Sequence, residues 1–174
     1  MSTFLLIILR LIHIVAASLW VGAAIFYLFF VKPSVKAIGP SGAQFMQNLT
    51  VRRKYPTFMA SVSILTILAG AALYLYTSDG FDIDWIKTGT GIGLTVGALA
   101  GVAAFIIGAA GIGPTSAKLG ALGQQINNSG GKPTPDQTNA LHALEKRLVL
   151  IERLDFTMLT IALLAMAVAR YLDF

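Results

Sequence analysis

Four long apolar runs alternate with shorter polar segments along the chain. The runs cover residues 3–31, 57–77, 86–112 and 154–172. Each is long enough for the roughly 20 residues that a membrane-spanning helix needs. The pattern therefore predicts an all-α fold, a bundle of four transmembrane helices that forms a single integral membrane domain over residues 1–174.

The polar segment between the third and fourth runs predicts a helical hairpin over residues 113–153. Thr134, Pro135 and Gln137 form a capping-box pattern that begins a helix. Apolar residues then recur at spacings of three and four and continue into the fourth run, so we expect one helix over about 135–172. These apolar residues are Leu141, Leu144, Leu148 and Ile151.

A shorter segment, residues 40–55, mixes apolar residues with amides and a basic cluster. This mixture favours an amphipathic helix that lies on the inner membrane surface.

The charges predict the orientation of the bundle. The formal net charge is +5, and ten of the 13 basic residues fall in or beside the two longer connections, which carry only four of the eight acidic ones. Since Lys and Arg are in excess on the cytoplasmic side, we expect both longer connections, hairpin included, inside and both termini outside. This arrangement predicts a bacterial inner-membrane protein whose basic rim contacts the lipid bilayer, with no nucleic acid as partner.

Composition supports the same class and narrows the chemistry. Hydrophobic residues make up 56% of the chain, charged residues 12%, and the mean hydropathy is +0.74. The chain has no cysteine, which excludes disulfides, thiolate metal sites and cysteine nucleophiles. Few residues lie outside the apolar runs, so we expect no separate soluble catalytic domain.

Glycines recur every fourth residue in the third run, at Gly89, Gly93, Gly97 and Gly101. This spacing places them on one helical face, where the missing side chains allow another backbone to approach closely. We interpret the stripe as a helix-packing seam. The seam and the hairpin are also the surfaces through which we expect a homo-oligomer or a larger membrane complex to assemble.

The first run carries the candidate cofactor site. His13 and, one turn earlier on the same face, Arg10 are ionisable groups at membrane depth, where such groups tend to face the bundle interior. An imidazole can bind haem iron and a guanidinium can pair with a propionate. The alternative is a neutral His13 bonded to a neighbouring helix, with Arg10 reaching the headgroups.

Lys87, at the outer start of the third run, is the candidate second haem ligand, because a partly buried lysine can lose its proton and coordinate. The alternative is an interfacial anchor beside Trp85. The second histidine, His142, is expected on the surface of the hairpin.

Two further groups of residues have weaker patterns. Thioethers suit Cu(I), but Met59, Met158 and Met166 form no cluster, which favours apolar filling over a copper site. Asp155, beside Glu152, lies at the inner mouth of the fourth run. We expect a structural charge cluster there with Arg52 and Arg53, and a proton relay as the alternative.

Several motifs resemble a superfamily of four-helix membrane proteins that includes CopD-like copper-resistance domains and HemJ-like protoporphyrinogen oxidases. They are residues 11–23 (LIHIVAASLWVGA), Arg52–Pro56, Gly70, Trp85–Lys87 and Arg153–Asp155. The HemJ-like resemblance implies that His13 and Lys87 hold a b-type haem, and the CopD-like resemblance implies copper handling. The glycine-rich third run and the long hairpin depart from the HemJ-like pattern, so oxidase activity is not carried over.

The resemblance leaves three functional expectations. The first is membrane redox chemistry or haem handling through His13. The second is a non-catalytic accessory subunit of a larger membrane complex. The third is copper transport or resistance.

Overall fold

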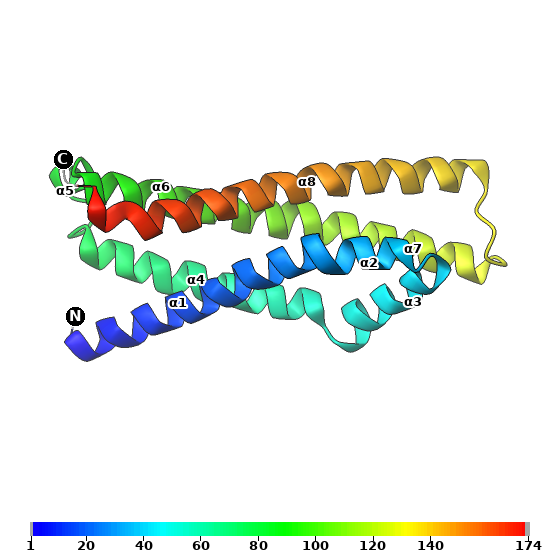
Figure 1. Ribbon diagram of the computed structural model, residues 1–174, viewed down its shortest axis with the longest axis horizontal. Coiled ribbons are helices and arrows are strands. Elements are labelled where there is room, and N and C mark those ends of the chain that lie inside the picture. The colour runs from blue at the N-terminus through cyan, green and yellow to red at the C-terminus, as the bar shows by residue number, and fades with distance from the viewer. Residues whose placement is uncertain (1, 173–174) are drawn as a thin grey trace.

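The computed structural model describes residues 2–172, and its secondary structure over this range is entirely helical (Figure 1). The all-α prediction is therefore confirmed. In chain order the elements are α1 (Thr3–Phe26), η1 (Tyr27–Val31), α2 (Lys32–Ala37), α3 (Pro40–Gln47), η2 (Asn48–Arg52), α4 (Tyr55–Thr77), α5 (Ile83–Ile86), α6 (Gly89–Ile106), η3 (Ile107–Ile112), α7 (Gly113–Asn128), α8 (Pro135–Val168) and η4 (Ala169–Tyr171). The first three η segments are π-helical and η4 is a 3₁₀ turn.

Three continuous helical rods are long and apolar enough to cross a membrane. They are Thr3–Ala37 with 35 residues, Tyr55–Thr77 with 23, and Gly89–Asn128 with 40. The first and third rods each join two α-helices through a π-helical segment, η1 or η3. These rods correspond to the first three predicted spans, which supports a membrane protein.

The last helix, α8, is continuous over 34 residues and passes into η4. This confirms the long helix predicted over about 135–172. It is not among the rods apolar enough to be candidate spans, because Glu152, Arg153 and Asp155 lie together where its apolar part begins. A fourth span over 154–172 therefore stays a prediction.

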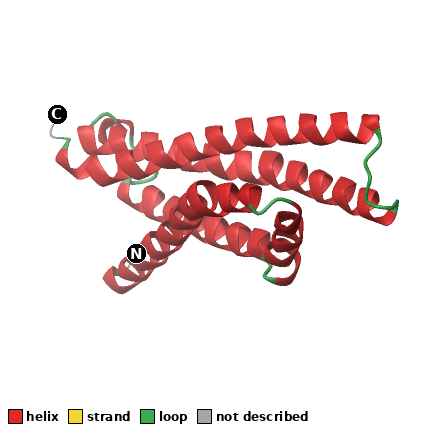
Figure 2. Cartoon of the chain, turned by 45° about the vertical axis from the view of Figure 1, so that its right-hand side comes forward, coloured by secondary structure: helices red, strands yellow, loops and turns green. Residues whose placement is uncertain are grey.

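The long helices pack as two pairs, α1 with α4 and α6 with α8 (Figure 1). Figure 2 shows the helix that starts at the N-terminus crossing the others obliquely. The pairs meet at a small core that takes residues from all four helices. Its members are Trp20, Ala24, Val62, Ala104 and Leu159.

The glycine stripe joins the second pair. All four glycines are buried, and the stripe faces the end of the chain. A Cβ on Gly93 would lie 2.8 Å from the Ala169 Cβ, and one on Gly97 would lie 2.6 Å from Met166 Cγ. The seam thus packs α6 against α8 and η4. A homo-oligomer or larger complex, still a prediction, would have to use another face.

Beyond the bundle, α7 and the first half of α8 form a two-helix arm (Figure 1). At its tip the capping box is present: the Thr134 hydroxyl accepts from the Gln137 N–H at 3.2 Å, and the Thr134 N–H donates to Gln137 Oε1 at 2.9 Å. The segment predicted as an amphipathic helix, 40–55, folds as α3 and η2. Both segments are thus helical. The cytoplasmic hairpin and the amphipathic helix on the inner membrane surface stay predictions.

Candidate functional site

His13 lies on the face of α1 that packs against α4. The side chains on this face become more buried along the helix, from exposed at Arg10 to buried at Trp20. The residues that share the face are Leu6, Arg10, His13, Ala17 and Trp20. Residues three and four apart share a helical face, so the spacing noted in the sequence corresponds to one side of a helix pair. The imidazole is half-buried within this seam.

A hydrogen bond to α4 orients the imidazole of His13. Its Nδ1 lies 2.9 Å from the carbonyl oxygen of Thr66. Since a carbonyl oxygen only accepts, the ring proton belongs on Nδ1 and the Nε2 lone pair points elsewhere. Metal-binding histidines commonly have this arrangement, in which one nitrogen donates to a backbone carbonyl and the other is the ligand.

Gly70 makes room for this imidazole. A Cβ at position 70 would lie 2.7 Å from His13 Cε1 and 2.9 Å from Nδ1, closer than carbon atoms pack without strain. Gly70 and Thr66 are four residues apart on α4, so together they form one surface under the ring. Sequence reasoning noticed Gly70 only through the family resemblance and did not connect it with His13.

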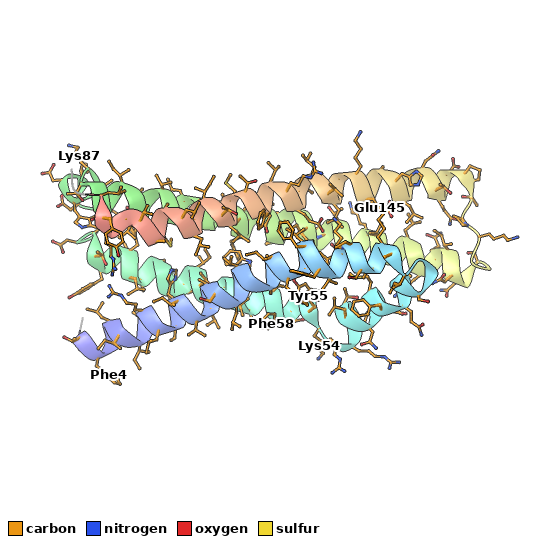
Figure 3. The ribbon with its side chains drawn as sticks, in the orientation of Figure 1. Phe4, Lys54, Tyr55, Phe58, Lys87 and Glu145 are labelled. Carbon is orange, nitrogen blue, oxygen red and sulfur yellow. The ribbon has the colours of Figure 1, made fainter. Side chains whose placement is uncertain are left out.

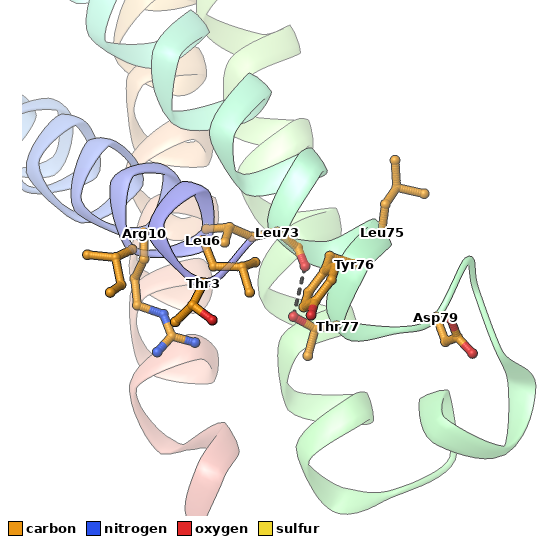
Figure 4. Close-up of a pocket in the computed structure, with 9 residues that line it drawn as sticks. Thr3, Leu6, Arg10, Leu73, Leu75, Tyr76, Thr77 and Asp79 are labelled. Atoms are coloured by element: carbon orange, nitrogen blue, oxygen red, sulfur yellow. Dashed lines mark hydrogen bonds between the residues drawn. The ribbon is translucent and has the colours of Figure 1, made fainter. Parts of the chain in front are cut away.

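Arg10 lines a cleft of about 810 Å³ at the end of the α1–α4 pair that lies near the N-terminus (Figure 4). Thr3, Leu6 and Ile7 of α1 form one wall, and the end of α4 forms the other, through Leu73, Leu75, Tyr76 and Thr77. Asp79 completes the rim. His13 lies one helical turn beyond Arg10, and Gly70 lies one turn before Leu73. The His13–Gly70 contact therefore follows the inner end of the cleft.

Lys87 does not join this site. Its side chain is 70% exposed, and its ammonium lies 3.6 Å from an Asp84 carboxylate oxygen. It belongs to the turn between α5 and α6, whereas His13 packs on α4. Figure 3 shows Lys87 at one corner of this end of the molecule and Phe4, near the start of α1, at the opposite corner. The structure thus does not support Lys87 as a second haem ligand, and its position fits the interfacial anchor.

The other candidate ligands are also dispersed. Met59 and Met158 pack against the central core, and Met166 covers Gly97. His142 is exposed on the arm, as expected. Among residues 2–172, no group of three or more His, Asp or Glu side chains could hold a metal ion.

The predicted charge cluster around Asp155 exists, but its cation is different. Glu152 forms an ion pair with Lys32, which directly follows η1 in the first rod. Arg52 and Arg53, the expected partners, are exposed. Lys32 is 120 residues from Glu152 in sequence, so only the packing of the first rod beside α8 brings the two side chains together.

Comparison with known proteins identifies no relative: no family model, no curated protein and no solved structure matches this chain. The resemblance to CopD-like and HemJ-like proteins therefore depends on the short motifs alone.

Proposed function

We propose that this chain is a membrane protein that binds a b-type haem in the outer cleft between α1 and α4, with His13 as an axial ligand. The observation that carries this proposal is the bond from His13 Nδ1 to the Thr66 carbonyl, 2.9 Å long. It orients the ring and leaves Nε2 for iron. We also propose, from the short motifs alone, that the chain is related to the CopD-like and HemJ-like membrane proteins.

The cleft supports the proposal by its size and by its one basic group. Its volume of about 810 Å³ falls within the roughly 300–1,000 Å³ of cofactor pockets. Arg10 lines it and can pair with a propionate. A bound haem would supply one-electron chemistry at the membrane. The protein's own part is to orient the imidazole and to bind the carboxylate. No observation in residues 2–172 favours copper, since the methionines act as packing.

The absorption spectrum of purified protein tests the haem proposal. Protein from haem-replete cells, purified in mild detergent, should show a Soret band and haem in proportion to the chain. The His13→Ala variant should lose the band, because it lacks the ligand. The matched control is His142→Ala, which changes the exposed histidine of the arm and should keep the band. A colourless wild-type protein, or an unchanged spectrum in His13→Ala, would overturn the proposal.

The proposed membrane arrangement has four spans, with both termini and residues 78–88 outside and the arm in the cytoplasm of a bacterial cell. The charge asymmetry supports it. Single cysteines can test it directly, because the chain has none of its own. An impermeant thiol reagent added to intact cells should label Asp84→Cys and leave Lys132→Cys unlabelled until the cells are opened. The reverse pattern would invert the topology.

A further inference from the structure

A second polar site lies at the other end of the first rod, where η1 and η3 pack near α8. Two acidic residues of α8 are buried there: Glu152 is 5% exposed and Asp155 is 8% exposed. Buried charges in proteins are normally paired, because removing them from water is costly. Each of the two carboxyls therefore needs a partner.

Glu152 has its partner and Asp155 does not. The ammonium of Lys32 pairs with Glu152. The Oδ1 atom of Asp155 is inaccessible to solvent and has no hydrogen-bond partner within residues 2–172. Two carboxylates and one ammonium leave one negative charge without compensation inside the protein.

The elements packed beside this part of α8 bring two tyrosines near Glu152. Tyr27 of η1 and Tyr55 of α4 stack with ring centroids 5.6 Å apart, and Glu152 is within electrostatic range of both. The Tyr55 hydroxyl donates to the Ala23 carbonyl at 3.2 Å. From the other side, η3 contributes only Ile, Gly and Ala. Besides Lys32 and Glu152, the packed elements thus bring Tyr27 and Tyr55 to this region. Arg153 of α8 itself is exposed.

Few oxygen ligands are gathered at Asp155. Gly108 of η3 faces this carboxyl, and a Cβ added there would lie 4.0 Å from Asp155 Oδ1, an ordinary van der Waals distance. A hard metal cation takes six or more oxygen ligands, and the carboxyls of Glu152 and Asp155 supply only four oxygen atoms. A proton needs only one lone pair, so it fits this set of ligands.

The backbone on both sides of the site is π-helical. The η1 segment precedes Lys32 directly, and η3 packs on α8 opposite Asp155. Single π-helical turns within α-helices occur frequently at functional sites. The two membrane rods thus deviate from regular α-helix where the polar cluster lies.

We propose that Asp155 is a reversible proton-binding site at the inner end of the bundle, with the Lys32–Glu152 pair positioned beside it. The step is simple: the carboxylate of Asp155 takes one proton from water at this end and returns it there. The ammonium of Lys32 pairs with Glu152, so Asp155 is the carboxyl left to exchange a single proton. This site is separate from the proposed haem cleft, and neither proposal depends on the other.

Infrared difference spectroscopy can test this proposal on the full chain in lipid. Spectra recorded at neutral and alkaline pH should differ by the C=O stretch of one protonated carboxyl, which shifts in D2O. The band should disappear in Asp155→Asn and shift in Asp155→Glu. The control Glu145→Gln changes an exposed acid of the same helix and should keep the band. A band that survives in Asp155→Asn would overturn the proposal.

A second variant keeps the test decisive if Asp155→Asn fails to fold. In Lys32→Gln two buried carboxyls lack an ammonium, so a second protonated-carboxyl band is expected. Its absence from folded protein would contradict the proposal. Sodium is the competing ligand: loss of the wild-type band on adding NaCl at constant pH, with choline chloride as control, would assign the site to a metal cation instead.

Discussion

Two regions along the first rod differ in the polar groups that they bring together. Near the N-terminus, Arg10 of α1 lines a cleft of about 810 Å³, and His13 lies one helical turn further along the helix. Beyond η1, Lys32 meets Glu152 of α8, and Asp155 is buried on the same helix. The first region is an open cleft with one basic group, whereas the second collects two buried carboxyls and one ammonium. The comparison shows that the packing partner decides which polar groups a helix meets.

Removal of the Lys32 ammonium should have the largest effect, a loss of folding stability. In Lys32→Ala the buried carboxyl of Glu152 loses its ammonium, and breaking a buried ion pair costs about 3–5 kcal/mol. Because the Lys32 side chain is 36% exposed, we expect a smaller loss, about 2–3 kcal/mol, in unfolding titrations in mixed detergent micelles. The double variant Lys32→Ala/Glu152→Ala should recover most of this loss. Equal instability of both variants would show that charge balance is not the cause.

A change in the glycine seam should destabilise the packing of α6 on α8 and leave the α1–α4 pair unchanged. In Gly93→Val the added side chain meets Ala169, since even a Cβ would lie 2.8 Å from the Ala169 Cβ. Overpacking of this kind should cost about 2 kcal/mol of stability. The control Gly101→Ala, where the nearest atom is 4.0 Å away, should be close to neutral. The haem spectrum should persist in both variants, because the cleft is formed by α1 and α4. Loss of the spectrum would show that haem binding also depends on the packing of α6 on α8.

A smaller change beside His13 should lower the affinity for haem and leave the Lys32–Glu152 pair intact. Gly70→Ala places a methyl group 2.7 Å from His13 Cε1 and must displace the ring. We expect haem affinity to fall about tenfold, about 1.4 kcal/mol, in a haem titration of the apoprotein. The matched change is Gly22→Ala on α1, which meets nothing within 4 Å and should leave affinity unchanged. Equal affinity in Gly70→Ala would place the haem elsewhere.

The smallest effect on haem binding is expected from a change of Arg10. Its side chain is exposed, and ion pairs in exposed positions contribute about 0.2–1 kcal/mol. Arg10→Gln should therefore weaken haem binding about threefold, and high salt should reduce the difference from wild type. Arg170→Gln, which changes an exposed arginine of η4 that does not line the cleft, is the control. A loss as large as that of His13→Ala would mean that Arg10 has a structural role.

The sequence predicted the helices better than their partners. The capping box at Thr134 and the apolar spacing defined the last helix, because both signals are local. The glycine spacing likewise predicted a packing face, since every fourth residue shares a side of a helix. Which helix covers that face depends on the topology, and the structure shows that it is the chain's own α8.

The candidate sites show the same limit. His13 and Arg10 were found because ionisable groups are rare inside apolar runs. Their surroundings, Thr66 and Gly70, carry no distinctive signal, since small residues are common in packed membrane helices. Lys87 was selected by its position near the outer end, but the turn between α5 and α6 leaves it in solvent with Asp84.

By itself, the sequence determined the helical class, the candidate spans and the side chains able to carry charge or bind a ligand, because hydrophobic period and composition act along a single segment. Only the tertiary structure decided that His13 donates to Thr66, that Lys32 rather than Arg52 pairs with Glu152, and that Asp155 Oδ1 is left without a partner. These contacts join residues up to 120 positions apart. They exist only when whole helices pack, and a local pattern does not encode which helices do so.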